Sequence, residues 1–327
     1  MQGVKRFGWF VCGVLAVAIT GSVSGCRSAT MQPAQALPSW DVDRAETITW
    51  QSDDPHFEQD FALEASGLAA SGEYLYVTSE KYARLLLVDT TGDYRVRVVP
   101  LDVPRHAELE GVALTRDGLA MCDEAHAAVY GVPVADKEIL VGNDGVVALQ
   151  AEEHPMVGVG VRGGKIGFEG IEVSREDGTV FLLLERSGDE AAGCVSKIYP
   201  LHPENGQLMS RTEPLEIALE DCAWRLTGLA WWKGTLLALK TQFPGERYEI
   251  VTVDLENGDI EVALDLTELL RALATEGWSN NVEGIAVAPD GALWLVADNK
   301  VTGVIDDPFP PPTDDRTLLL KLPLSVE

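Results

Sequence analysis

One phrase recurs along this chain, and its recurrence is the strongest constraint on the fold. Residues 281–299 read NVEGIAVAPDGALWLVADN: a Gly after an acid, a hydrophobic run, an Asp-Gly turn, a second hydrophobic run and a further acid. Four similar copies precede it. The spacing of 44 to 59 residues between copies is that of a repeated supersecondary unit. The key glycines of the five copies are Gly67, Gly111, Gly170, Gly228 and Gly284.

Each copy predicts a sheet of antiparallel strands. A turn dipeptide such as Asp177-Gly178 between two hydrophobic runs is a strong hairpin signal. The second run is nearly continuous, as in VFLLL at 180–184, which is typical of a strand buried on both faces. Third and fourth strands follow, for example at 248–260 and 261–266. Four antiparallel strands that repeat in this way predict an all-β protein, a β-propeller.

The ends of the chain predict how the ring closes. The fifth copy has a third strand at 316–324 but no fourth, whereas residues 46–52 form a strand without a unit of its own. That N-terminal strand would complete the last blade, so we expect one propeller domain over residues 46–327 with five blades. A sixth blade between 125 and 167 is the alternative. Helical periodicity is limited to 266–277.

The N-terminus resembles a bacterial lipoprotein signal. Lys5 and Arg6 precede an apolar stretch, and Val23-Ser24-Gly25-Cys26 reads as a lipobox. We therefore predict a signal peptide over 1–25, a lipid on Cys26 and a tether over 26–45. This would place the protein in the cell envelope, at the outer membrane, facing the periplasm or the cell surface.

The net charge limits the classes of binding partner, and the cysteine content limits the possible disulfides. The formal net charge of −27 argues against nucleic acid and anionic lipid headgroups as ligands, because both would be repelled. It suits cation binding, although solubility alone is an equal explanation. In an oxidising compartment Cys194 and Cys222 could pair. Free buried thiols, Cys122 among them, are the other reading.

The acidic residues of the repeats are the candidate site. In a propeller, the first strand of a blade starts, and the second ends, on the same face, so acids at both places should meet near one axial opening. A hard cation such as Ca²⁺ takes six to eight oxygen ligands, and it would relieve the repulsion among these acids. Calcium or another divalent cation is the predicted cofactor. The predicted metal ligands are Glu169, Glu283 and Asp298, followed by Glu110 and Glu185.

Other readings of these acids are simpler. Each acid could pair with a nearby base such as Arg186, Lys240 or Lys300. The chain has no G-x-S-x-G, P-loop or H-E-x-x-H motif, and its five histidines are isolated in sequence. Catalysis would therefore have to be metal-assisted or based on carboxylates.

The copies FEGIEVSREDGTVFLLLER and NVEGIAVAPDGALWLVADN resemble the phytase-like esterase family of secreted propellers, and also the SdiA-regulated family of bacterial propellers. The first resemblance implies hydrolysis of esters or phosphoesters with Ca²⁺. Gluconolactonase-type propellers bind a divalent metal through a Glu-Gly, which by analogy supports Glu169 or Glu283 as a ligand. Ser66 and Thr227 depart from the acidic pattern, and no Lys/Arg-rich crown suits inositol phosphate.

Two functions follow as hypotheses. The first is a metal-dependent hydrolase that binds an ester or phosphoester in the axial cleft. The second is a non-catalytic propeller that presents its crown to a protein or glycan.

Overall fold

The computed structural model describes most of the chain beyond the N-terminal segment. The chain divides into two units, 1–33 and 34–327, and every described residue lies in the second. The predicted lipidation site, Cys26, and the predicted partner Lys300 lie outside the described residues. Those described are 37, 39–133, 148–161, 167–186, 194–243, 245–299 and 309–325.

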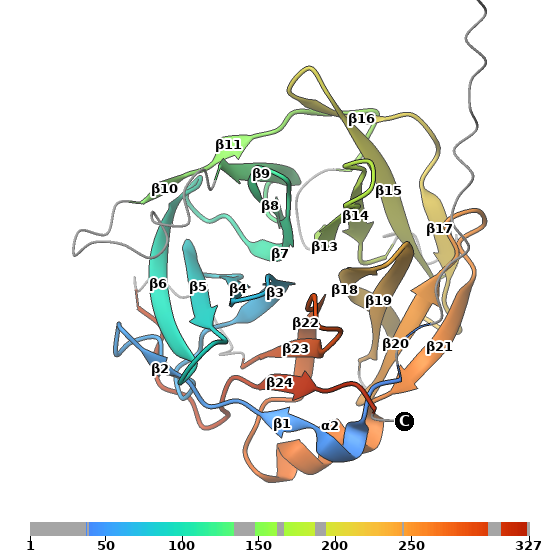
Figure 1. The fold of residues 1–327 in the computed structure, drawn as a ribbon. Helices are drawn as coiled ribbons and strands as arrows, with labels where there is room; N and C mark the ends of the chain where they lie inside the picture. Colours follow the sequence, from blue (N-terminus) through green and yellow to red (C-terminus); the bar gives the residue numbers. More distant parts are fainter. Residues whose placement is uncertain are drawn as a thin grey trace, which may run out of the picture. The chain divides into compact units, whose positions relative to one another are not determined.

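Five antiparallel sheets of four main strands surround one axis, which confirms the predicted five-bladed propeller (Figure 1). Blade 1 consists of β3 (Ala65–Ala70), β4 (Tyr74–Ser79), β5 (Arg84–Asp89) and β6 (Arg95–Asp102). Blade 2 consists of β7 (Leu109–Leu114), β8 (Gly118–Asp123), β9 (Ala128–Pro133) and β11 (Glu152–Glu153). Blade 3 consists of β13 (Phe168–Val173), β14 (Val180–Leu184), β15 (Val195–Glu204), and the outer strands β16 (Gln207–Ser210) and β17 (Leu215–Ala218).

The last two blades follow the same order from the axis outward. Blade 4 consists of β18 (Trp224–Trp232), β19 (Thr235–Gln242), β20 (Arg247–Val253) and β21 (Ile260–Asp265). Blade 5 consists of β22 (Asn281–Val287), β23 (Leu293–Asp298), β24 (Leu319–Leu322) and β1 (Glu46–Thr47). The innermost strands, β3, β7, β13, β18 and β22, lie next to the axis in Figure 1.

The ring closes as the sequence predicts. β1 pairs antiparallel with β24, with Glu46 opposite Lys321 and Thr47 opposite Leu320. The backbone N–H of Ile48 also donates to the carbonyl of Leu319 at 2.8 Å. The N-terminal strand therefore completes the blade that the C-terminal strand begins, so both ends of the described chain are fixed in one sheet.

The hydrophobic core lies between the blades. Each of five buried clusters joins the facing sides of two neighbouring sheets, and every blade therefore contributes to two clusters. This explains the continuous apolar runs of the second strands: β14, for example, is buried along its whole length. Strands buried on both faces need apolar residues at every position.

The described residues after β9 do not form a single fourth strand for blade 2. β10 (Leu149–Gln150) pairs in parallel with β6 of blade 1. The short β11 takes the outer place in blade 2, and β12 (Met156–Val157) pairs with β16 of blade 3. The described residues between 125 and 167 thus extend three existing blades, and they form no sixth one.

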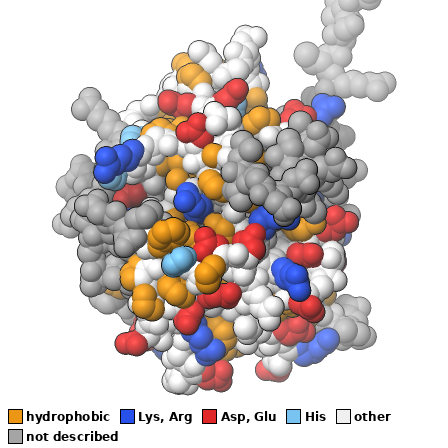
Figure 2. Space-filling model, turned by 90° about the vertical axis from the view of Figure 1, so that its left-hand side faces the viewer, with side chains coloured by type: hydrophobic (Ala, Val, Ile, Leu, Met, Phe, Trp, Pro, Cys, Tyr) orange, Lys and Arg blue, Asp and Glu red, His pale blue; other side chains and the backbone are white. Residues whose placement is uncertain are grey.

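Few elements lie outside the blades. α2 (Thr267–Thr275) falls within the predicted helix and buries Leu270 and Leu273 against the core between blades 4 and 5. The short β2 (Gln51–Ser52) pairs with β6, and a 3₁₀ turn, η1, covers Val42–Arg44. Acidic side chains are spread over the side of the molecule in Figure 2 and are not confined to one patch.

Candidate active site at the axial mouth

Each inner strand is bulged beside its key glycine. In β7, Leu109 pairs with Asp123 and Gly111 pairs with Cys122, so Glu110 has no partner on β8. The other inner strands shift register at the same place. A bulge bends the strand and re-aims the extra residue. The residues at this position are Ser66, Glu110, Glu169, Thr227 and Glu283.

The key glycines allow the inner strands to approach one another. A Cβ on Gly111 would lie 2.8 Å from the backbone nitrogen of Ile171, and a Cβ on Gly284 would lie 2.4 Å from the carbonyl oxygen of Ser66. Side chains at these positions would push neighbouring blades apart. The recurrence of Gly in the repeat is therefore a requirement of close backbone approach.

Three carboxylates and one hydroxyl line a small cavity on the axis. Glu110, Glu169, Glu283 and Thr227 surround it together with their glycines, and its volume of about 10 Å³ is near the least that holds one water. All four residues are at most 9% exposed. The hydroxyl of Ser66 donates to Oε2 of Glu110 at 2.6 Å. Within the described part of the chain, the buried Oγ1 of Thr227 has no hydrogen-bond partner.

The axial carboxyls hold protons more tightly than usual. Burial raises the pKa of Glu110 well above its ordinary value, and the nearby charges of Glu169, Glu80 and Glu283 raise it further. The pKa of Glu169 is raised for the same reasons, first burial and then the neighbouring carboxylates, of which Glu185 is the strongest. The axis therefore favours either a bound proton or a bound cation.

Arg225 joins three blades at the mouth of this cavity. Its Nη1 donates to Oε1 of Glu185 in blade 3 at 2.9 Å. Its Nη2 lies 3.4 Å from Oδ1 of Asn281 and 3.5 Å from Oε1 of Glu283, both in blade 5. The side chain is 20% exposed, so one part of the guanidinium faces the protein and another can reach solvent.

Asn281 links Glu283 to a further acid, Asp298. Its Nδ2 donates to Oε1 of Glu283 at 2.9 Å and to Oδ2 of Asp298 at 3.1 Å. Three of the five predicted metal ligands, Glu185, Glu283 and Asp298, are therefore held by an arginine and an amide that the protein itself supplies.

Glu124 is the most chemically distinctive carboxyl of the mouth. It is partly exposed, and its side chain lies against Gly167, where a Cβ would come within 2.4 Å of the Glu124 Cγ. Burial raises its pKa to about 7, with contributions from Glu108, Glu80 and Glu185, while Lys81 opposes the shift. Lys81 donates to Glu108 at 2.8 Å and to Glu80.

A histidine and an aspartate pair beside Glu124. Nδ1 of His126 lies 2.7 Å from Oδ2 of the buried Asp123. Asp123 also accepts hydrogen bonds from the Tyr130 hydroxyl at 3.2 Å and from the Glu108 backbone N–H at 3.0 Å. The carboxylate thus orients an imidazole whose side chain is 41% exposed.

The predicted acids converge at one end of the axis, but the residues that hold them were not predicted. Arg225 and Asn281 stand three positions before the key glycines of their repeats, where the other copies carry Glu64, Glu108 and Gly167. Aligning this position across the repeats is the signal that could have found them. Glu124, directly after β8, was not among the predicted metal ligands.

The simpler pairing hypothesis holds in part. Nε of Arg186 lies 3.4 Å from Oε2 of Glu185. Lys240, in contrast, pairs with Glu220 at 2.6 Å and Glu249 at 3.0 Å, away from the axial carboxylates.

Metal binding stays a prediction. Across the residues that the structure describes, no group of three or more His, Cys, Asp or Glu side chains is arranged as metal ligands. The donor chemistry at the axis nevertheless suits a hard cation, because three carboxylates and the Thr227 hydroxyl supply only oxygen. The five predicted ligands divide between this cavity and the Arg225 network.

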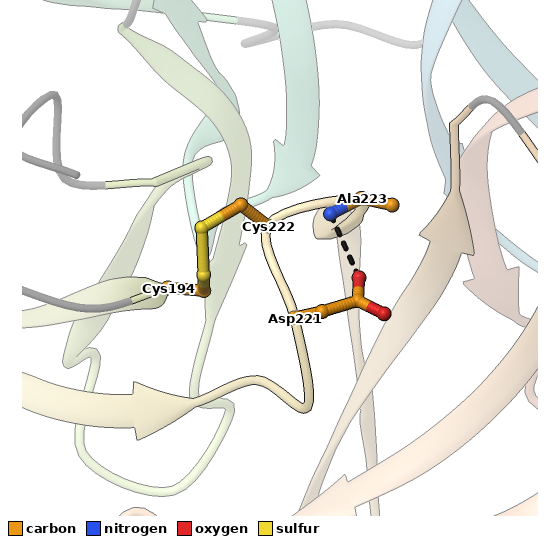
Figure 3. Close-up of a disulfide and its surroundings, with 4 residues drawn as sticks. All are labelled: Cys194, Asp221, Cys222 and Ala223. Carbon is orange, nitrogen blue, oxygen red and sulfur yellow. Dashed lines mark hydrogen bonds between the residues drawn. A yellow bond between two sulfur atoms is a disulfide. The ribbon is translucent and has the colours of Figure 1, made fainter.

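A disulfide lies close in sequence to the strand that carries Arg225. Cys194, at the start of β15, is bonded to Cys222, three residues before Arg225 (Figure 3). The side chain of Asp221 accepts the backbone N–H of Ala223 at 2.8 Å, which forms a turn before β18. The bridge settles the pairing that the sequence left open, and Cys122 is a free, buried thiol.

The fold and this site define a class: a five-bladed propeller with an acidic pocket at one end of its axis. Within that class, the chain belongs to the phytase-like family, described as having the esterase-like activity of phytase, because the family profile matches residues 27–300.

One solved structure with a TM-score above 0.5 supports the fold. The crystal structure of Myxococcus xanthus glutaminyl cyclase is 13% identical, has a TM-score of 0.52, and matches over 90% of this chain and 100% of its own. The PQQ-bound aldose sugar dehydrogenase from Streptomyces coelicolor is 13% identical with a TM-score of 0.41, over 88% of this chain and 100% of its own. No curated protein sequence matches the chain. Over the described residues, no helix has the length and apolar character to cross a membrane.

Proposed function

We propose that this protein is a hydrolase of esters or phosphoesters that acts at the axial mouth. The observation that carries the proposal is that two unlike groups at this mouth both interact with Glu185. Glu124 is a partly exposed carboxyl with a pKa of about 7, and Arg225 is a partly exposed guanidinium. Both interact with Glu185, and membership of the phytase-like family supports the same reaction class.

Each group has a definite role in this proposal. The Glu124 carboxylate takes a proton from water as the water oxygen attacks the carbonyl carbon or phosphorus. Arg225 donates to the oxygen on which negative charge develops. Protonated Glu124 then returns its proton to the leaving alkoxide, so the carboxylate is regenerated. A group with a pKa near 7 suits both halves of this cycle.

The test uses p-nitrophenyl acetate and bis(p-nitrophenyl) phosphate as substrates. We expect Glu124→Gln to lower kcat/KM by about 10²- to 10⁴-fold, the usual contribution of general acid–base catalysis. In the unaltered protein, kcat/KM should rise as the pH passes through about 7, because only the carboxylate accepts a proton. His126→Gln is the matched control, since it removes the adjacent titratable group.

Two results would overturn these roles. Activity that survives Glu124→Gln but is lost in His126→Gln would move the base to the His126–Asp123 pair. No turnover by a folded protein would favour the alternative, a non-catalytic propeller that binds a protein or glycan at its crown.

We also propose that a divalent cation, calcium first, binds at the axis with Glu110, Glu169 and Glu283 as its ligands. When bound it would neutralise the carboxylates beneath the mouth. The proposal rests on the unpartnered Thr227 hydroxyl and on the raised pKa values of Glu110 and Glu169. Glu185 and Asp298 would lie outside these three ligands, where they are held by Arg225 and Asn281.

Calorimetry with CaCl₂ at pH 7.5 tests the cation. We expect measurable heat and a higher melting temperature in the unaltered protein, and neither in the Glu110→Gln, Glu169→Gln double variant. No heat at millimolar calcium, together with turnover that EDTA leaves unchanged, would show that protons alone relieve the repulsion.

We further propose a lipid anchor on Cys26 and a location in the cell envelope, at the outer membrane. The Cys194–Cys222 disulfide supports this location, because such bonds persist in oxidising compartments.

A further inference from the structure

The end of the axis opposite Glu124 and Arg225 carries a second, larger hollow. Turns between the first and second strands of blades 1, 2, 3 and 5 line it, and its volume is about 690 Å³. Its walls combine apolar side chains from Leu114, Val173 and Pro289 with two arginines, Arg116 and Arg175. The hollow is large enough for a small organic molecule.

These two arginines place positive charge at the hollow of a protein whose acids are in excess. Acids outnumber bases 52 to 25, and bases such as Lys81, Lys197 and Arg211 pair with carboxylates. Arg116 and Arg175 are exposed, and no described residue forms a hydrogen bond or ion pair with either of them. Two guanidinium groups from adjacent blades therefore reach the same hollow with their donors unused.

The carboxylates near the hollow form their hydrogen bonds with groups other than Arg116 and Arg175. Asp177 accepts the backbone N–H of Thr179 at 3.0 Å and its hydroxyl at 2.9 Å, which holds its pKa below the ordinary value despite the opposing effect of burial. Oε1 of Glu176 lies toward blade 4, 3.6 Å from where a Cβ on Gly234 would be. Glu172, which precedes the lining residue Val173, is half-buried and accepts backbone N–H groups from Val173 and Trp231. Burial raises its pKa, and these hydrogen bonds and the charge of Arg175 oppose that rise.

We propose that this hollow binds a small organic anion, a phosphate or carboxylate joined to a compact apolar group. The planar guanidinium presents paired N–H donors that match the oxygens of either anion. The apolar wall would cover the carbon skeleton of the ligand. This site lies at the other end of the propeller from the proposed hydrolase and does not depend on it.

Calorimetric titration of the full protein tests the proposal with three probes at constant ionic strength. The probes are phenylphosphonate, benzoate and neutral benzyl alcohol. Phenylphosphonate has a carbon–phosphorus bond and cannot be hydrolysed as an ester, so binding is measured apart from any turnover. We expect one of the anions to bind and benzyl alcohol to bind at least about tenfold more weakly, a loss equal to one charge-assisted contact.

Variants assign the binding to this hollow. The double variant Arg116→Gln, Arg175→Gln should lower the affinity for the anion at least about tenfold. The double variant Arg116→Lys, Arg175→Lys should keep part of this affinity because the charges remain. Arg95→Gln, an exposed arginine on the outer strand of blade 1, removes a similar charge elsewhere and should change little. Circular dichroism confirms that each variant is folded.

Three outcomes would overturn the proposal. They are the absence of binding by either anion, equal binding of benzyl alcohol, and anion binding that the double Gln variant leaves unchanged. Loss of binding in Arg225→Lys but not in the double variant would place the anion at the axial mouth instead. Loss of hydrolysis with anion binding intact would refute only the proposed enzyme activity.

Discussion

At the scale of single residues, the mouth of the channel is a set of acids whose charges are balanced in different ways. Glu185 and Glu283 share one guanidinium, that of Arg225. Glu110 and Glu169 are buried with raised pKa values, so a proton or a cation must balance them. Partial burial, together with neighbouring carboxylates, raises the pKa of Glu124 to about 7. The differences in burial and partners therefore separate residues that look alike in sequence.

A carboxyl at the other end of the axis predicts how stability depends on pH. The side chain of Glu172 accepts the backbone N–H groups of Val173 at 2.8 Å and Trp231 at 3.0 Å. Burial raises its pKa to about 7, above the ordinary value of 4.5. The folded state thus binds this proton more tightly than the unfolded state. Its contribution is fully present below pH 4.5 and is lost as the pH rises to about 7, a change on the order of 3 kcal/mol.

Urea unfolding at several pH values measures this effect in Glu172→Gln. The variant should lose about 1–3 kcal/mol near pH 4.5, because the amide NH₂ cannot accept a backbone N–H. The difference between the two proteins should narrow as the pH rises toward 7. A constant difference over that range would show that Glu172 has an ordinary pKa when folded.

At the scale of elements, the repeat is a device that presents one side chain per blade to the axis. The bulge re-aims the residue before the glycine, and the glycine lets the next inner strand pass close by. The disulfide Cys194–Cys222 adds a covalent constraint where β15 begins and the turn before β18 ends. The axial carboxylates Glu110, Glu169 and Glu283 are therefore held on strands, whose positions are more precise than those of loops, whereas Glu124 lies in the turn after β8.

The glycine requirement predicts a large effect for one methyl group. Gly111→Ala would place a Cβ 2.8 Å from the nitrogen of Ile171 and 3.0 Å from the Cα of Gly170, both backbone atoms of blade 3. We expect a loss of about 1–3 kcal/mol in the free energy of unfolding, the usual cost of overpacking.

Gly92→Ala is the control, because nothing lies within 4 Å of a Cβ at that turn. It should change the stability by less than about 0.5 kcal/mol in urea. Equal effects of the two substitutions would mean that the inner strands can separate without cost.

At the scale of the whole molecule, the two ends of the axis differ in chemistry. One mouth gathers carboxylates around Arg225, and the other holds two arginines that form no hydrogen bond or ion pair in the described chain. The ring is closed by the N-terminal strand β1, which lies directly after the predicted tether. The proposed lipid site, Cys26, precedes this strand in the sequence.

Metabolic labelling with radioactive palmitate in a bacterial host tests the anchor. The unaltered protein should be labelled and should sediment with the outer membrane, whereas Cys26→Ala should be unlabelled and retain the signal peptide, because cleavage follows modification of this cysteine. Equal fractionation of both proteins without label would contradict lipidation.

The repeat itself determined most of the architecture. Glycine spacing, Asp-Gly turns and doubly buried strands predict the propeller and its closure, because these depend on local backbone geometry and on periodicity. Which blades the strands within residues 148–161 join was not predictable in this way. These strands are two residues long, and only the neighbouring sheet edges decide which blade each one joins.

The site was predictable in position but not in its balance of charge. The acids at Glu110, Glu169 and Glu283 converge because each occupies the same place in a repeated unit. Arg225 acts across blades, on Glu185 at a sequence separation of 40 and on Glu283 at a separation of 58. Which charge meets which partner depends on distances between blades, and only the closed ring sets those distances.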